Sequence, residues 1–229
     1  GGLLSEETGN IRTDGNDLLR LYNTIYYKSG WQDAFKSSQT KQDTFTAADG
    51  AAQTVDFMHR TESGSYRKGD GYTAASRSLN YGRMVFVLPD EGVTPESLLQ
   101  RQGFLAELTG DYNAAELVWS VPKFDVKSST ELNGVLQALG VTDAFDMAEA
   151  DFTPLTDNGA FLSSAMQAAR VKIDEEGVEA AAYTEIVCAD SAMMEVPPTV
   201  EMELDRPFLF VIFDYNNVPL FVGTVNTVA

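Results

Sequence analysis

Apolar and polar positions alternate along several segments of the chain, which is the two-residue period of a β-strand. From Leu19 to Tyr27 apolar side chains take every second position, and Asn23 falls on their face. We expect this face to be buried, so Asn23 needs hydrogen-bond partners there. Near the end of the chain, Val200, Met202 and Leu204 alternate with acidic residues, which predicts a half-buried strand.

Continuous apolar runs predict strands that are buried on both faces. Met84–Leu88 is such a run, and it ends at the turn residues Pro89–Gly92. Phe208–Phe213 and Leu220–Val225 flank Asp214–Pro219, which has the turn chemistry of a hairpin. The run from Phe208 to Phe213 is the longest and has only six residues. Because a membrane-spanning helix needs roughly 18 apolar residues, we predict no such span.

Two segments carry the start signals of helices. Thr94 is a good N-cap, and Pro95 suits the first helical position. Ser128 and Glu131 have the spacing of a capping box, and Gly140 suits a helix end, so we predict a helix from Ser128 to Gly140. Strands and helices are therefore mixed along the chain. The apolar stripe of the predicted helix consists of Leu132, Val135, Leu136 and Leu139.

The charge and composition limit the partners of the chain. Among its 229 residues, Lys and Arg number 16 and Asp and Glu number 34, so the formal net charge is −18, without a basic cluster. Nucleic acids and anionic membrane surfaces attract basic proteins, so we expect neither as a partner. The apolar fraction of 44% is typical of a globular protein, and the length suits one large domain or two small ones.

Residues that carry catalysis or bind metals are scarce. The one histidine, His59, lies in a strand-like segment, and we interpret it as a packed or solvated side chain. The one cysteine, Cys188, permits neither an internal disulfide nor a cysteine-based metal cage. Gly69-Asp70-Gly71 lacks the third glycine of a phosphate loop and fits a turn better. We therefore predict that the protein is not an enzyme and expect no cofactor.

The stretch from Ile173 to Asp205 contains no lysine or arginine and has the pattern of a conditional strand. It begins with an acidic turn, Asp174–Gly177, after a predicted strand. Beyond the turn, one face is small or apolar and fits a sheet, but three consecutive alanines hold a strand weakly. An exposed loop or a short helix fits the same residues. The small face consists of Val178, Ala180, Ala182, Thr184, Ile186 and Cys188.

Two motifs in this part of the chain resemble the serpin family. Glu175–Ala182 resembles the hinge of the serpin reactive-centre loop, and Met202–Ile212 resembles the serpin signature downstream of that loop. The resemblance implies an α+β fold, the serpin fold, with several mostly antiparallel sheets and surrounding helices. Other segments that agree in order are Leu21–Tyr27, Gly30-Trp31, Phe86–Asp90 and Val121–Phe124.

The resemblance covers only the later part of a serpin domain. We therefore expect residues 1–229 to be a partial domain, with the hinge and reactive-centre loop at residues 174–198. The missing N-terminal part, with the front helices and strands, is expected as a partner. The first residue is Gly rather than Met, and we expect that processing or truncation has removed the true start.

The resemblance also implies a suicide-type inhibitor of endopeptidases, of the serine class first and the cysteine class second. The target protease would cut the loop, form a covalent acyl complex and be trapped as the loop inserts into the large sheet. Because the loop lacks basic residues, we expect an elastase-, chymotrypsin- or subtilisin-like target rather than a trypsin-like one. The implied hinge residues are Glu175, Glu176, Gly177, Val178, Glu179, Ala180, Ala181 and Ala182.

Two counts along the family's loop locate the scissile bond differently. Counting forward from Gly177 places it after Ser191, and counting back from Pro197 places it after Met194. We favour Met193 and Met194, because flexible apolar side chains suit the expected protease pockets. The full set of candidates for the reactive bond is Ser191, Ala192, Met193, Met194 and Glu195.

Three residues outside the loop match positions that govern insertion in the family. Trp31 corresponds to the breach, where insertion begins, and Asn23 and Gln167 correspond to the shutter. Many serpins carry a histidine where this chain has Gln167, but glutamine can still hydrogen-bond Asn23.

Two alternatives to an active inhibitor stay open. A non-inhibitory serpin would act as a binding or carrier module, although the small hinge residues argue against it. The chain by itself would be an inactive fragment if insertion needs the missing strands, and its exposed strand edges would favour aggregation. An extracellular or cell-surface location is expected from the resemblance.

Overall fold

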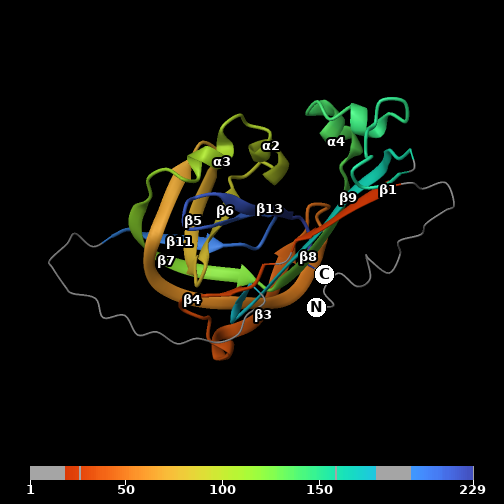
Figure 1. The fold of residues 1–229 in the computed structure, drawn as a ribbon. Helices are drawn as coiled ribbons and strands as arrows, with labels where there is room; N and C mark the ends of the chain where they lie inside the picture. Colours follow the sequence, from red (N-terminus) through yellow and green to blue (C-terminus); the bar gives the residue numbers. More distant parts are fainter. Residues whose placement is uncertain (1–18, 26, 158, 179–196, 229) are drawn as a thin grey trace. The chain divides into compact units, whose positions relative to one another are not determined.

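The computed structural model describes residues 19–25, 27–157, 159–178 and 197–228. The chain divides into a smaller unit, Gly1–Tyr27 with Val126–Val171, and a larger unit, Lys28–Asp125 with Lys172–Ala229. Figure 1 shows the helices and strands of both units. Each unit is therefore discontinuous in sequence, and strands β8 (Phe124–Glu131) and β9 (Leu162–Asp174) run from one unit into the other.

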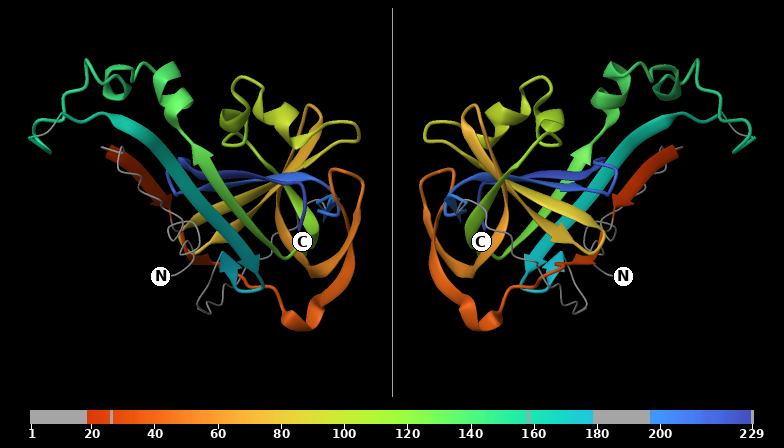
Figure 2. Two further views of the ribbon diagram at one scale, coloured as in Figure 1. Left: turned by 90° about the vertical axis from the view of Figure 1, so that its right-hand side faces the viewer. Right: turned by 90° about the vertical axis from the view of Figure 1, so that its left-hand side faces the viewer.

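The larger unit is built on an eight-stranded sheet with the order β11-β7-β4-β5-β6-β12-β13, in which β3 also pairs with β4. All its strand pairs are antiparallel except the parallel pair of β11 and β7. The long curved strand β4 pairs with β3 near its start and with β5 near its end (Figures 1 and 2). The strands are β3 (Thr40–Thr46), β4 (Ala52–Gly69), β5 (Tyr72–Leu79), β6 (Gly82–Pro89), β7 (Asn113–Pro122), β11 (Thr199–Glu203), β12 (Phe208–Phe213) and β13 (Pro219–Val225).

The strands of this sheet follow the apolar patterns of the sequence. The run Met84–Leu88 lies in β6 and is buried on both faces, as predicted. The expected hairpin forms between β12 and β13, and Asn217 in its turn has a φ of 61°. Met202 in β11 and Leu204 just after it are buried, which confirms the half-buried strand.

Two short helices cover one face of the larger sheet. They are α2 (Pro95–Leu99) and α3 (Phe104–Glu107), and both views place them over β5 and β6 (Figures 1 and 2). Thr94 caps α2 as predicted, because its side chain accepts a hydrogen bond from the backbone N of Ser97 at 3.2 Å. The core beneath the helices consists of Tyr72, Ala74, Val85, Val87, Leu98, Phe104, Leu108, Leu209, Val211 and Phe213.

The second sheet has five strands, with the order β1-β9-β10-β2 and β8 beside β9. The strand β1 (Leu19–Ile25) is parallel to β9, in agreement with the predicted strand from Leu19. The two-residue strands β2 (Ser29–Gly30) and β10 (Gly177–Val178) pair with each other in an antiparallel fashion. The described residues also contain two 3-10 helices, η1 (Ser37–Gln39) and η2 (Asp143–Phe145).

The predicted helix from Ser128 to Gly140 is wrong in its first half. Residues 128–131 belong to β8, and the helix α4 spans only Asn133–Ala138. The Asn133 side chain accepts a hydrogen bond from Ala165 N at 2.7 Å, so pairing with β9 overrides the capping-box signal. Gly140 still follows the helix end, with a φ of 95°.

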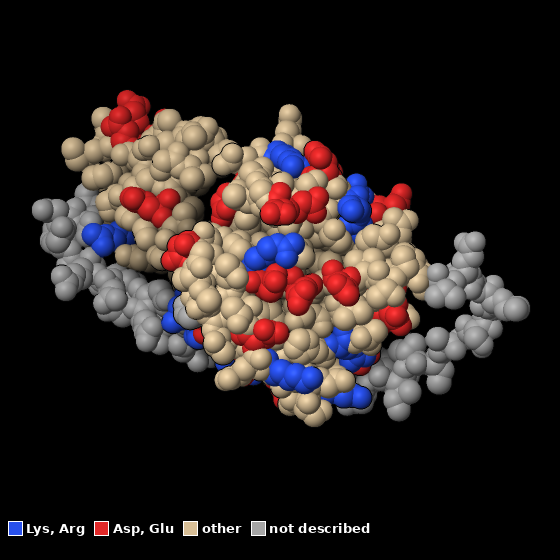
Figure 3. All heavy atoms as spheres, turned by 180° about the vertical axis from the view of Figure 1, so that it is seen from behind, with Lys and Arg blue, Asp and Glu red and all other residues tan. Residues whose placement is uncertain are grey.

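The charged side chains are mixed on the surface. On the face shown in Figure 3, Lys and Arg side chains lie scattered between Asp and Glu side chains. Among the described residues, no helix is both long and apolar enough to cross a membrane.

Candidate functional site

Two residues of the predicted hinge, Gly177 and Val178, form a short strand. In β10, Gly177 and Val178 face Asp174 and Ile173 of β9 on one side. On the other side they face Gly30 and Ser29 of β2. The Val178 side chain is only 1% exposed. Gly177 and Val178 therefore form a two-residue strand that is paired on both sides.

A tight turn reverses the chain between β9 and β10. The carboxylate of Asp174 accepts hydrogen bonds from the backbone N of Glu176 at 3.0 Å and of Gly177 at 3.3 Å. Gly177 has a φ of 146°, which side-chain-bearing residues rarely adopt. A Cβ atom at Gly177 would lie 2.5 Å from the carbonyl O of Ser29 and 2.6 Å from Cα of Gly30. Only glycine fits between the turn and β2.

Trp31 and the residues after it form the platform on which this turn docks. The buried indole of Trp31 donates from Nε1 to the carbonyl O of Asp174 at 3.1 Å. The backbone N of Trp31 donates to Glu176 O at 3.0 Å, and the backbone N of Phe35 donates to Glu175 O at 2.9 Å. We call Trp31–Phe35 the platform segment. Its hydrogen bonds hold each residue of the turn from Asp174 to Glu176.

Glu175 anchors the turn through its side chain as well. Its Oε1 accepts a hydrogen bond from Thr40 Oγ1 at 2.8 Å, and its Oε2 lies 3.0 Å from Lys123 Nζ. Burial raises the pKa of the Glu175 carboxyl, but the hydrogen bonds from Thr40 and Lys123 outweigh it, so the pKa lies below its ordinary value. The carboxylate is thus held in its ionised form.

A buried arginine also contacts the platform segment. Arg77 of β5 binds Glu62 with two nitrogens, at 2.8 and 3.2 Å, and donates from Nη2 to Asp33 O at 2.6 Å. Its guanidinium carbon lies 4.0 Å from the centre of the Phe35 ring and 5.0 Å from that of Trp31. Burial lowers the pKa of Arg77, and the Glu62 carboxylate opposes this shift.

Sequence reasoning missed Arg77, although a signal was present. Ala75, Arg77 and Leu79 alternate along β5, and all three are buried. A charged residue at an apolar position of a strand indicates a paired, buried charge. The partner Glu62 is 15 residues away on another strand, so its identity could not be read from spacing.

The shutter residues lie in the smaller unit. Asn23 of β1 and Gln167 of β9 are direct register partners in the parallel ladder. Asn23 is exposed, however, and Leu21 on the same face is 50% exposed, so the expectation of a buried face is wrong for the described residues. A side-chain hydrogen bond between Asn23 and Gln167 stays a prediction.

Several predicted site residues lie outside the part of the chain that the structure describes. Glu179, Ala180, Ala181 and Ala182 of the hinge belong to this set. So do all candidates for the reactive bond, Ser191, Ala192, Met193, Met194 and Glu195, as well as Cys188.

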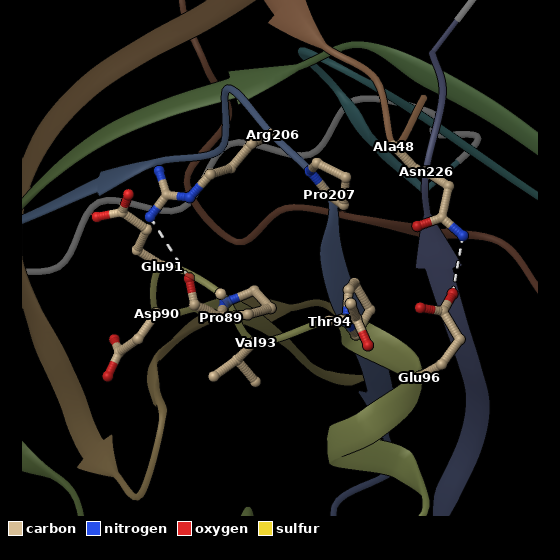
Figure 4. Close-up of a pocket in the computed structure, with 12 residues that line it drawn as sticks. Ala48, Pro89, Asp90, Glu91, Val93, Thr94, Glu96, Arg206, Pro207 and Asn226 are labelled. Carbon is tan, nitrogen blue, oxygen red and sulfur yellow. Dashed lines mark hydrogen bonds between the residues drawn. The ribbon is translucent and has the colours of Figure 1, made fainter. Parts of the chain in front are cut away.

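The larger unit also has a pocket of about 610 Å³, away from these residues. It lies between the start of α2 and the segment before β12, as Figure 4 shows. Arg206 Nη2 donates to Pro89 O at 3.4 Å, and Asn226 Nδ2 donates to Glu96 Oε1 at 2.8 Å (Figure 4). These donors are engaged by the pocket wall itself, and none of the predicted site residues lines it.

The short strand β10 thus leads directly into the acidic, alanine-rich segment whose sequence resembles the serpin hinge. A family model described as Serpin (serine protease inhibitor) matches residues 7–228. The chain belongs to the serpin family and has the serpin fold.

Similar proteins support this assignment at moderate sequence identity. Alpha-1-antiproteinase 2 of Equus caballus is 30% identical over 219 residues, which are 93% of this chain and 50% of the relative. Iris of Ixodes ricinus is 33% identical, over 93% of this chain and 58% of the relative. The crystal structure of the thermophilic serpin tengpin in the native state has a TM-score of 0.78 at 27% identity, over 98% of this chain and 61% of that one. The chain thus spans about half the length of the curated relatives it matches.

Proposed function

We propose that the full-length protein inhibits serine proteases by loop cleavage, acyl trapping and insertion of the loop into the five-stranded sheet. The observation that carries the proposal is β10, in which Gly177 and Val178 already pair with strands on both sides. A loop that begins as a central strand can extend that strand after cleavage. A loop used only as a surface for binding has no need of this arrangement.

The proposed reaction begins as ordinary proteolysis. The serine Oγ of the protease attacks the carbonyl carbon of the scissile peptide bond, with Met194 as the favoured residue. The C–N bond breaks, the new amine at Glu195 leaves with a proton, and an ester joins the protease to Met194. Hydrolysis of this ester would release a cleaved serpin. Insertion must therefore displace and deform the protease before water attacks the ester.

The geometry of a strand sets how far the protease moves. Roughly 15 residues inserted at about 3.3 Å each would carry it about 50 Å along the sheet. Each new ladder hydrogen bond contributes about 0.5–1.5 kcal/mol net, so full insertion releases on the order of 10 kcal/mol or more. This is comparable with the stability of a whole protein, so the trapped protease can be distorted.

Insertion requires β9 to exchange its partner. Residues Leu162–Ala169 of β9 pair with β1, whereas Ile173 and Asp174 pair with β10. A loop that continues beyond Val178 would take the place of β1 beside β9. The short hinge side chains at Ala180 and Ala182 suit this exchange because they need little space between strands.

The target class follows from the residues of the loop. No Lys or Arg occurs between Ile173 and Asp205, so the acidic specificity pocket of a trypsin-like protease finds no partner. Met193 and Met194 are flexible and apolar, and they suit elastase-, chymotrypsin- or subtilisin-like pockets.

The experiment mixes the full-length protein with an elastase-like and a trypsin-like serine protease, followed by denaturing gels and mass analysis of the released peptide. A detergent-stable complex with the elastase-like enzyme only, and a peptide that begins at Met194 or Glu195, is the expected result. Complete cleavage without a complex would refute inhibition and favour a binding or carrier role.

A further inference from the structure

Arg77 is a charged residue at a buried position of β5 whose neighbours on the same face are apolar. It is 4% exposed, and its strand neighbours on the same face, Ala75 and Leu79, have no exposed surface. Removing a guanidinium from water is costly, and a buried ion pair often stabilises a fold no more than an apolar group of similar size. Stability alone is thus a weak explanation for Arg77, and its contacts point to a role in geometry.

The contacts of Arg77 converge on the platform segment, Trp31–Phe35. Its guanidinium lies over the Phe35 and Trp31 rings, and Nη2 holds the carbonyl of Asp33. Glu62, which binds Arg77, also lies 2.6 Å from Nε of Arg60. These contacts fix both the backbone and the two aromatic rings of the segment.

Arg60 adds a second support to the same segment. It donates from Nη1 to the carbonyl O of Ala34 at 2.8 Å and forms an ion pair with the Asp33 carboxylate. The Arg60 side chain is 18% exposed, whereas the Arg77 side chain is 2% exposed, so Arg77 is the more buried of the two arginines.

The platform segment also binds the turn before β10. Trp31 and Phe35 donate to the carbonyls of Asp174, Glu176 and Glu175, as described above. Ser29 and Gly30, which pair with β10, directly precede Trp31 in the chain. A shift of the platform segment therefore moves one of the two strands between which Val178 lies.

We propose that Arg77 is a positioning residue that holds the platform segment in register with β10, and so determines whether a cleaved loop inserts before the acyl bond is hydrolysed. This proposal rests on the inhibitory function proposed above. Without Arg77, Trp31 and Phe35 lose the cation that lies over both rings, and β2 is no longer fixed as the partner of Gly177 and Val178. Insertion then starts from an unaligned strand and is slower, whereas cleavage of the reactive bond is unchanged.

The test compares Arg77→Met and Arg77→Lys with the matched control Arg83→Met in the full-length protein. Arg83, on β6 of the same sheet, also lies over an aromatic ring, at 4.8 Å from the centre of Phe213. Its hydrogen bonds go to Leu108 O and Asn217 Oδ1, so it serves as a cation–aromatic contact away from the platform segment. Lysine at position 77 keeps the charge but cannot bind Glu62 in the same two-nitrogen manner.

Three quantities are measured with an elastase-like protease: the rate of loop cleavage, the number of inhibitor molecules consumed per protease trapped, and amide hydrogen exchange at residues 31–35 and 174–178. We expect both Arg77 variants to keep the cleavage rate. We expect exchange at both segments to accelerate about two- to tenfold, as for the loss of one ladder hydrogen bond. The number of molecules consumed per trapped protease should rise by a similar factor, and more for Met than for Lys.

The control separates geometry from general stability. Arg83→Met should leave both the consumption number and the exchange of these segments at wild-type values. An equal change in Arg83→Met, or wild-type behaviour of folded Arg77→Met and Arg77→Lys, would overturn the proposal. If the wild-type protein traps no protease, the inhibitory function fails, and the exchange at residues 31–35 and 174–178 still decides whether Arg77 positions them.

Discussion

Replacement of Gly177 by alanine is expected to release β10 from the sheet. The new Cβ would meet backbone atoms at 2.5 Å and 2.6 Å, in Ser29 and Gly30, and backbone cannot move aside as a flexible side chain can. The φ of 146° adds strain of about 1–3 kcal/mol for a residue with a side chain. We therefore expect the chain to give up the contacts of β10 rather than keep them in distorted form.

The structure sets the size of this loss. Burial of the Val178 side chain, 1% exposed, contributes about 1.5–3 kcal/mol. The two residue pairs of β10 with β2 add about 0.5–1.5 kcal/mol for each hydrogen bond. With one hydrogen bond for each of the two pairs, these contributions amount to about 2.5–6 kcal/mol, so protection of the Val178 amide should fall by about 10²- to 10⁴-fold.

Hydrogen exchange on the full-length protein, read at residues 172–178, measures this change. The matched control is Gly50→Ala, because Gly50 also has a positive φ, 84°, but nothing lies within 4 Å of the Cβ that alanine would add there. The control should lose about 1–2 kcal/mol of stability without any change at Val178. A folded Gly177→Ala protein with wild-type protection at Val178 would show that the close approach of Gly177 to β2 does not matter.

Three further predictions concern other contacts. The pKa of Glu175 is depressed from 4.5, so the ionised carboxylate stabilises the docked turn above that pH, and this contribution is lost as the pH falls through the folded-state pKa. Glu175→Gln should therefore flatten the pH dependence of the unfolding midpoint between about pH 6 and 3. Equal slopes in the wild-type protein and the variant would contradict this. Val178→Arg places an unpaired charge at a buried position and should keep loop cleavage but abolish the covalent complex; a trapped complex on a denaturing gel would refute it. Thr94→Ala removes the cap of α2 and should cost about 1 kcal/mol in thermal unfolding, with no change in protease trapping.

The sequence predicted four of the eight strands of the larger sheet, β6, β11, β12 and β13, from their apolar runs or alternation. Met84–Leu88 and Phe208–Phe213 are buried, and β6 and β12 pair with each other inside the sheet, each with a further strand on its other edge. The helix predicted from Ser128 was wrong for residues 128–131, which lie in β8, a strand that pairs with β9. The capping-box signal is local, and tertiary pairing overrides it.

The candidate site was only partly predictable. The resemblance placed Trp31 and the hinge, and Gly177 could be suspected from its acidic turn. The pairs of Glu175 with Lys123 and of Arg77 with Glu62 join residues 52 and 15 positions apart. Such pairs depend on how strands lie side by side, and no local pattern carries that information.

The pairing of β10 fixes in advance which side chains of an inserting loop would face each way. Val178 lies opposite Ser29 and is buried, so residues at even distances from it inherit its inward orientation if the strand continues in the same register. Ala180, Ala182, Thr184, Ile186 and Cys188 would all turn inward, and Glu179 and Glu185 outward to water. One residue inserted after Val178 would reverse this parity and bury both carboxylates, whereas two inserted residues would preserve it.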